Sequence, residues 1–117
     1  MMTQKELRAF YRDRAALRTT EETLAGLRAY ATASDDDLER DIAALEEAIR
    51  KQAAVLDARN AEVLATLEAV DDICRRTELR LHFYLGMEWK EVAEILGASC
   101  QTVRNRCSQA LQACVPE

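Results

Sequence analysis

Apolar residues recur along the chain at helical spacing, and they never alternate with polar residues as they would in a strand. Near the start, Thr3 and Glu6 form a capping-box pattern, and the spacing that follows predicts a helix over residues 4–31. Its recurring apolar residues are Leu7, Phe10, Leu17, Leu24 and Leu27. The pattern predicts an all-α protein.

A second apolar run follows the polar stretch TASDDD, where Ser34 can cap a helix and the aspartates suit the positive end of its dipole. The run has the spacing of a heptad seam, interrupted at Gln52, Arg59 and Thr66. The seam consists of Leu38, Ile42, Leu45, Ile49, Leu56, Val63 and Val70. Because the linker is short, we expect the two long helices to form an antiparallel, coiled-coil-like hairpin.

From about residue 70 the elements become short. Residues 73–85 predict a helix that ends at Gly86, and EWKEVAEILG predicts a two-turn amphipathic helix that ends at Gly97. Ser99 can cap a last helix. The expected buried residues of these last two helices are Val92, Ala93, Ile95, Leu96, Val103, Cys107, Ala110 and Leu111. We therefore divide the chain into a helical hairpin and oligomerisation region at 1–69 and a small helical domain at 70–117.

Charge limits the kinds of partner that the chain can attract. The net charge is −5, with 10 basic and 14 acidic side chains in residues 1–70 and six basic and seven acidic ones in residues 71–117. The C-terminal part is nearly neutral, so it permits a local basic face without a strong general attraction to DNA.

The remaining composition argues against enzymatic and membrane functions. The start of the chain lacks the apolar block of a signal peptide, and no apolar run is long enough to span a bilayer. We therefore expect a cytoplasmic protein with four reduced cysteines. Cys100, Cys107 and Cys114 recur every seven residues, which on one helix separates them by about 10 Å, too far to share a metal ion. His82 is the only histidine, and we expect it to be packed. No cofactor, metal or catalytic site is predicted.

The last two helices carry the frame of a helix-turn-helix. Ala93 is followed after four residues by Gly97 and after six more by Val103. A small residue lets the helices cross closely, the glycine makes the turn, and the β-branched residue fixes the crossing. The predicted core of this module is Trp89, Val92, Ala93, Leu96, Gly97, Val103, Cys107 and Leu111.

The run GMEWKEVAEILGASCQTVRNRCSQAL resembles region four of bacterial sigma factors. The residues that carry the resemblance are Gly86, Met87, Glu91, Val92, Ala93, Glu94, Leu96, Gly97, Ser99, Thr102, Val103, Arg104, Arg106, Ala110 and Leu111. HFYLGMEWKEVA, with Trp89, is also similar to small phage and prophage regulators of the ArpU type. Glu88 stands where these families usually have a serine or threonine cap, which predicts a weak helix start.

The resemblance implies that the last helix enters the major groove of duplex DNA with Cys100, Gln101, Arg104 and Asn105 facing the bases. Arginine pairs well with guanine, and asparagine or glutamine with adenine. The predicted phosphate contacts, which position the protein without specifying sequence, are Lys90, Ser99, Thr102 and Arg106.

The resulting interpretation is a DNA-binding transcriptional regulator of phage or prophage type, which forms a homodimer through its N-terminal helices or contacts RNA polymerase. Two alternatives stay open. One is a coiled-coil adaptor for RNA polymerase or another regulator that never touches DNA. The other is a small-terminase-like phage packaging subunit, which also combines a helix-turn-helix with an oligomerising helical part.

Overall fold

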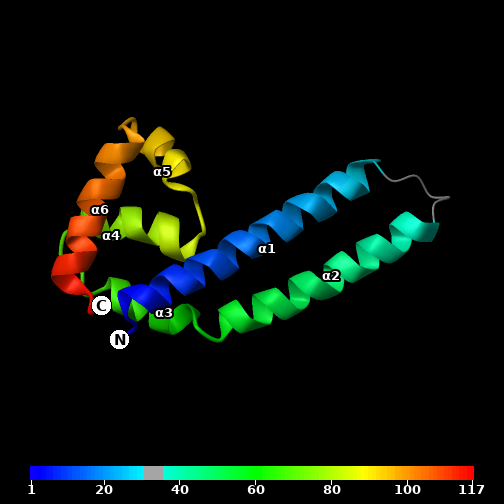
Figure 1. Cartoon of the computed structure of the whole chain (residues 1–117), viewed down its shortest axis with the longest axis horizontal. Helices are drawn as coiled ribbons and strands as arrows, with labels where there is room; N and C mark the ends of the chain where they lie inside the picture. Colours follow the sequence, from blue (N-terminus) through cyan, green and yellow to red (C-terminus); the bar gives the residue numbers. More distant parts are fainter. Residues whose placement is uncertain (31–35) are drawn as a thin grey trace.

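The computed structural model describes residues 1–30 and 36–117, and this part of the chain is all-α, as predicted (Figure 1). Two long antiparallel helices form an arm, and the shorter helices gather at one end of it. The elements are α1 (Gln4–Tyr30), α2 (Asp36–Asp57), α3 (Asn60–Leu67), α4 (Ile73–Leu79), the π-helical turn η1 (Arg80–Tyr84), α5 (Trp89–Leu96) and α6 (Cys100–Cys114). The predicted cap at Ser34 lies outside the described residues.

The hairpin of α1 and α2 forms as predicted, but its core lies at one end. Leu7, Phe10 and Leu17 of α1 belong to the main core, whereas Leu56 is the only buried residue of α2. The seam residues nearer the start of α2 are half-buried. An exposed ion pair between Arg28 and Glu46, at 3.3 Å, joins the two helices there, and such pairs contribute little. The outer arm is therefore thinly stabilised.

The prediction that a single second helix carries the whole seam from Leu38 to Val70 is wrong, because the chain breaks between α2 and α3. Arg59 has φ −112° and ψ −4°, and its guanidinium donates to the Glu6 carboxylate at 3.0 Å. The Asn60 side chain accepts a hydrogen bond from Arg14 at 3.0 Å. These contacts with α1 turn α3 toward η1, where Val63 is buried.

Thr66, which interrupts the predicted seam, is buried and fully used. Its hydroxyl accepts the Met2 backbone N–H at 2.9 Å and donates to the Glu62 carbonyl at 2.9 Å. A polar residue on the seam therefore attaches the start of the chain to α3, in place of a coiled-coil contact.

The first half of α1 packs among the shorter helices, α3 to α6, which we call the C-terminal cluster. The Gln4 backbone N–H donates to the Pro116 carbonyl at 2.8 Å, and its side-chain amide donates to the Val115 carbonyl at 3.0 Å. One buried core runs from Met2 to Val115. These contacts cross the boundary at residue 69 that the sequence suggests, so α1 belongs structurally to both regions.

A three-ring stack fixes α1 against α5. The His82 ring lies between Tyr11 of α1, with ring centroids 4.0 Å apart, and Trp89 of α5, at 3.8 Å. Its Nδ1 is 2.7 Å from the Met87 carbonyl, which can only accept, so Nδ1 carries a proton. Burial lowers the pKa of His82 to about 4, and the charge of Arg104 acts in the same direction.

The loop between η1 and α5 lies directly on α1. Gly86 has φ +75°, and a Cβ there would be 2.4 Å from Cγ of Arg14. Arg18 donates to the Gly86 carbonyl at 2.7 Å and holds both carboxylate oxygens of Glu91, at 2.9 and 3.0 Å. Only a glycine allows this close approach.

The three glycines give a graded test of this contact. In Gly97→Ala the added Cβ meets no other atom within 4 Å, but the alanine must adopt φ +65°. This substitution should therefore destabilise the fold by about 1 kcal/mol. Gly86→Ala adds the collision with Arg14 and should cost at least about 2 kcal/mol. Gly26→Ala, in the open interior of α1, should stabilise by about 0.5–1 kcal/mol. Urea unfolding checks the order, and equal costs at Gly86 and Gly97 would contradict the close approach.

The His82 stack predicts a pH-dependent stability. Since the folded-state pKa of about 4 lies below the ordinary 6.5, the unfolded chain binds the proton first as pH falls. Stability is therefore full above about pH 6.5 and decreases toward pH 4, by about 1–2 kcal/mol between pH 7 and pH 5. His82→Phe keeps an aromatic ring and removes the titration. Urea unfolding followed by circular dichroism should show a smaller pH dependence in this variant, and an equal one would refute the assignment.

Candidate nucleic-acid interface

α5, a tight turn and α6 form the helix-turn-helix. Gly97 adopts φ 65° and ψ 31°, and the next residue, Ala98, donates its N–H to the Ala93 carbonyl at 3.1 Å. The Ser99 hydroxyl accepts the Thr102 backbone N–H at 3.1 Å, which caps α6. The buried residues of the module are Val92, Ala93, Val103, Cys107 and Leu111.

Two residues predicted to be buried on α5 lie at the surface. Ile95 is 60% exposed and Leu96 is 40% exposed. α5 has only two turns, and Val92 and Ala93 already fill its contact with the core. Leu96 instead lines a shallow hollow with the exposed Ile73 of α4.

The start of α5 has a better cap than Glu88 alone predicts. The Glu91 carboxylate accepts the Glu88 backbone N–H at 3.0 Å, which is one half of a capping box. The hydrogen bond from Arg18, together with that from Glu88, lowers the pKa of Glu91 to about 2. Trp89, the first residue of α5, is half-buried because one face stacks on His82.

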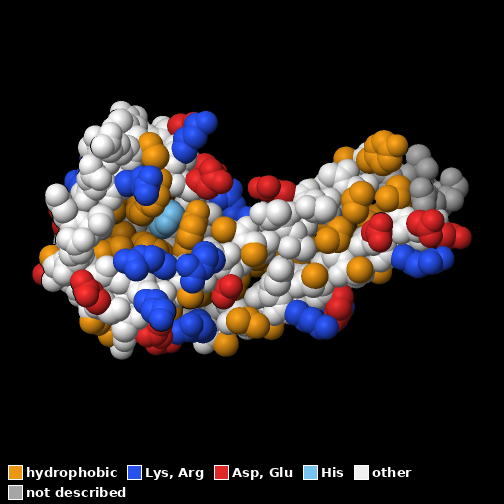
Figure 2. Space-filling view, viewed as in Figure 1, with side chains coloured by type: hydrophobic (Ala, Val, Ile, Leu, Met, Phe, Trp, Pro, Cys, Tyr) orange, Lys and Arg blue, Asp and Glu red, His pale blue; other side chains and the backbone are white. Residues whose placement is uncertain are grey.

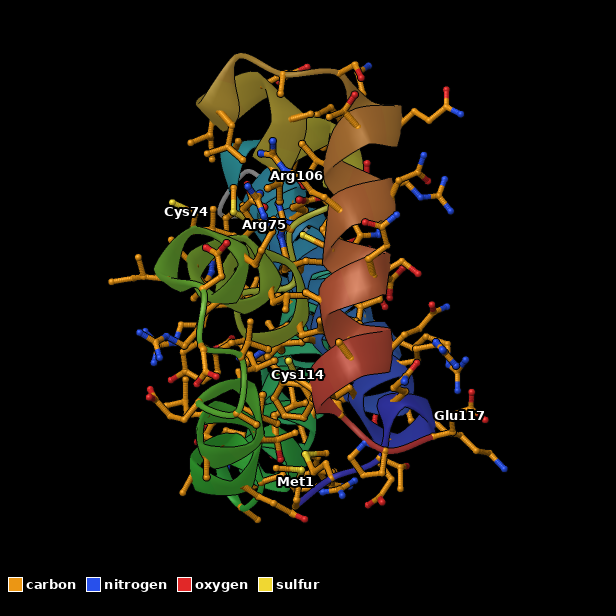
Figure 3. All side chains as sticks on the ribbon, turned by 90° about the vertical axis from the view of Figure 1, so that its left-hand side faces the viewer. Met1, Cys74, Arg75, Arg106, Cys114 and Glu117 are labelled. Carbon is orange, nitrogen blue, oxygen red and sulfur yellow. The ribbon has the colours of Figure 1, made fainter. Side chains whose placement is uncertain are left out.

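The predicted base-contacting residues share the outer face of α6. Cys100, Gln101, Arg104, Asn105 and Ser108 line one surface hollow, and all but the half-buried Cys100 are exposed. Polar side chains of α6 project together on one side of the helix in Figure 3. Within the described part of the chain, no hydrogen bond or ion pair engages the side chains of Gln101, Arg104 or Asn105. Their donors and acceptors are available to an external partner.

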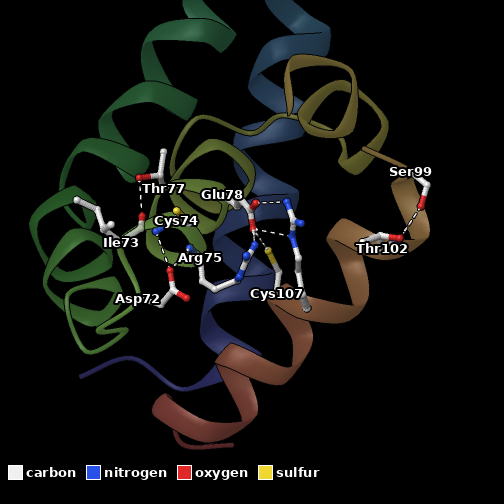
Figure 4. Close-up of polar contacts among 10 residues, drawn as sticks. Asp72, Ile73, Cys74, Arg75, Thr77, Glu78, Ser99, Thr102 and Cys107 are labelled. Atoms are coloured by element: carbon white, nitrogen blue, oxygen red, sulfur yellow. Dashed lines mark hydrogen bonds and ion pairs between the residues drawn. The ribbon is translucent and has the colours of Figure 1, made fainter. Parts of the chain in front are cut away.

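The predicted phosphate contacts differ in how free they are. Lys90 is exposed. Ser99 and Thr102 are exposed but joined, since the Ser99 hydroxyl donates to the Thr102 hydroxyl at 2.7 Å (Figure 4). Arg106 points the other way, toward α4, where its guanidinium binds Glu78. We therefore assign Arg106 to the packing of α6 on α4, in place of the phosphate contact that the sequence predicts.

A buried carboxylate organises that packing. Glu78 is 3% exposed and receives hydrogen bonds from Arg106, with Nε 3.2 Å from Oε1, from Arg75 and from the Cys107 thiol at 3.5 Å (Figure 4). Burial alone would raise the pKa of Glu78, but the hydrogen bonds from the two arginines outweigh it and leave the pKa below its ordinary value. Burial and the Glu78 charge raise the pKa of Cys107 to about 12, so this thiol stays protonated.

Sequence reasoning did not find this cluster. Arg75 and Glu78 stand three residues apart, which fits an ordinary surface pair on a helix. Nothing in the sequence pattern places Arg106, 28 residues later, on the same carboxylate.

Comparison with known proteins finds a family match for the C-terminal part of the chain. Residues 75–114 match the family model described as Sigma-70, region 4. The match begins in α4 and ends with α6, so it covers the helix-turn-helix and the Glu78 cluster but leaves α1, α2 and α3 outside. No curated protein and no solved structure matches the chain. Residues 75–114 are therefore similar to sigma-70 region 4 domains, which are DNA-binding modules of transcription.

The described residues include neither a membrane-spanning helix nor a metal-binding cluster. None of the helices there is long and apolar enough to cross a membrane. Over the same residues, no group of three or more histidine, cysteine or acidic side chains is arranged to hold a metal ion.

The contribution of an ion pair to the free energy of unfolding should depend on how deeply the pair is buried. Glu78→Gln leaves two arginines without their buried counter-charge, and we expect a loss of about 2–3 kcal/mol of unfolding free energy at pH 7. Glu68 also pairs with two arginines, Arg76 and Arg80, but its side chain is 55% exposed. Glu68→Gln should therefore cost less than about 1 kcal/mol. Chemical denaturation of both variants measures the difference, and equal costs would overturn the structural role of Glu78.

Proposed function

We propose that this chain is a transcriptional regulator that binds duplex DNA with α6 in the major groove. The observation that carries the proposal is the uncommitted outer face of α6, within a domain that matches sigma-70 region 4. Arg104 and Arg106 lie two residues apart, yet within the described residues only Arg106 binds a carboxylate, that of Glu78. Folding therefore leaves the other one available for a partner.

The proposed base contacts follow from side-chain chemistry. Arg104 suits the two acceptors of guanine, and Asn105 and Gln101 suit adenine. Cys100, half-buried at the start of α6, lies at the edge of this surface. Lys90 and the joined hydroxyls of Ser99 and Thr102 are proposed phosphate contacts.

The finer proposal is a cytoplasmic phage or prophage regulator whose N-terminal helices, residues 1–69, form a homodimer or reach RNA polymerase. The sequence HFYLGMEWKEVA supports the phage type, and Trp89 within it has a defined role in the aromatic stack. The thinly covered outer arm, with the exposed Tyr30, supports self-association. A two-fold dimer would require a palindromic site with half-sites separated by whole turns of DNA.

A second candidate is an adaptor that binds only protein. The observation in its favour is the group of exposed apolar residues on α4 and α5, namely Ile73, Ile95 and Leu96, in a chain of net charge −5. In that case, substitutions on the outer face of α6 would leave function intact.

The deciding experiment selects fragmented host and phage genomic DNA with the purified protein, at about 50 and 200 mM salt, followed by sequencing. Wild type should enrich one motif. The double variant Arg104→Ala, Asn105→Ala should lose it, because each good bidentate contact is worth about 1–3 kcal/mol of discrimination.

Arg40→Ala is the control, because it removes one positive charge from an exposed position near the start of α2. It should select the same motif as wild type. If the folded wild type retains no DNA at either salt, the adaptor becomes the better reading. A ring of eight or more chains in solution would instead favour the packaging subunit.

A further inference from the structure

A hollow lies between α1 and α6, beside the proposed DNA-binding face. Figure 2 shows basic side chains around it and the single histidine at its floor. Its lining comes from three parts of the chain: Gln4, Arg8, Tyr11 and Arg12 of α1; His82, Phe83 and Trp89 beneath; and Arg104, Ser108, Leu111 and Gln112 of α6. The lining includes three arginines and no acidic residue.

The hollow continues into the outer face of α6. Arg104 and Ser108 line both this hollow and the one that holds the proposed base contacts. Neither lining includes a carboxylate. The acidic excess lies elsewhere, since α2 alone has seven acidic and three basic side chains. A chain of net charge −5 therefore presents a locally positive surface on this one side.

α1 is held rigidly at this place. The Gln4 amide donates to the carbonyls of Leu111, at 3.4 Å, and Val115, at 3.0 Å, both in the last part of α6 or just after it. The Gln4 side-chain oxygen accepts a hydrogen bond from Arg8 at 3.2 Å. One residue thus orients Arg8 and fixes it relative to α6, so the arginine is pre-organised.

Arg8 and Arg12 have no counter-ion among the described residues. They stand four residues apart on α1, both are exposed, and no ion pair engages either. Like charges at this spacing slightly destabilise a helix. Other arginines near the C-terminal helices are neutralised by a carboxylate, as Arg106 is by Glu78 and Arg18 of α1 is by Glu91. Because no carboxylate neutralises either guanidinium of Arg8 and Arg12 within the described residues, both charges are available to an external anion.

We propose that α1 is a second DNA-binding element, in which Arg8 and Arg12 bind backbone phosphates beside the groove that α6 enters. The inference rests on the proposed function, and it adds to the region 4 domain a contact from outside residues 75–114. Arginine binds phosphate through charge-assisted and often bidentate hydrogen bonds. Such contacts set how the domain sits on the duplex, and they strengthen binding to every sequence alike.

The test compares Arg8→Ala, Arg12→Ala with wild type on a duplex of mixed sequence and on the motif enriched from genomic DNA. Fluorescence anisotropy is measured across a salt series from about 50 to 200 mM. Two lost phosphate contacts should reduce the slope of log K against log salt by about 2 and weaken binding to both duplexes by a similar factor, about tenfold or more at the lower salt. The preference between the duplexes should not change.

Two control variants separate this contact from general charge. Arg40→Ala, Lys51→Ala removes the same charge from α2 and should leave the slope near that of wild type. Arg8→Lys, Arg12→Lys keeps both charges and should retain most of the slope. Circular dichroism and urea midpoints of each variant establish that it is folded.

The outcomes distinguish the two proposals. If wild type binds neither duplex, the proposed function fails and this inference fails with it. If wild type binds but the double alanine variant has the wild-type slope, or if the α2 control loses as much, only the role of α1 is refuted. Tighter binding of wild type to the same sequence as duplex RNA, or to an acidic peptide, would also overturn the assignment of the surface to DNA.

Discussion

The His82 ring, held between Tyr11 and Trp89, is the contact on which the relative positions of α1, α5 and α6 depend. α5 begins at Trp89, so stacking on its indole fixes the first helix of the helix-turn-helix against α1. The turn at Gly97 then places α6, and Gln4 joins the far end of α6 back to α1. Because His82 is buried and neutral at physiological pH, this contact requires no counter-ion and leaves nearby arginines uncommitted.

Arg75, Arg104 and Arg106, on α4 and α6, differ in whether they bind a buried carboxylate. Arg75 and Arg106 converge on Glu78, where a single buried carboxylate aligns α4 with α6. Arg104, on the opposite side of α6, has no acidic neighbour in either hollow that it lines. An ion pair occupies the donors with which a guanidinium could bind an external anion, so Arg75 and Arg106 serve the packing of the helices, whereas within the described part of the chain the donors of Arg104 stay free.

The features that the sequence predicted correctly are those that depend on residues close together along the chain. The all-α class, the antiparallel hairpin and the Gly97 turn follow from periodicity, a short linker and glycine's tolerance of positive φ. The break at Arg59 could not be predicted, because it depends on contacts with α1 residues about 50 positions earlier. The exposure of Leu96 was missed for a related reason: an amphipathic pattern marks a face that could be buried, but another element must cover it.

The same distinction holds for the site. The sequence and its family resemblance suggested Gln101, Arg104 and Asn105, whose side chains form no hydrogen bond or ion pair within the described residues. They also suggested Arg106, whose orientation toward Glu78 is a tertiary property. Arg8 and Arg12 gave no signal at all, since two arginines on a long charged helix are common. Only the packing of α1 beside α6 brings them to the same surface.

The aromatic stack also contains an intrinsic fluorescent probe. Trp89 is the only tryptophan of the chain, and its indole lies on the imidazole whose other face contacts Tyr11 of α1. Indole emission therefore originates from the junction between the arm and the region 4 domain and from nowhere else. Whether α1 stays docked when the protein meets DNA can be followed in the unmodified chain, without an attached dye.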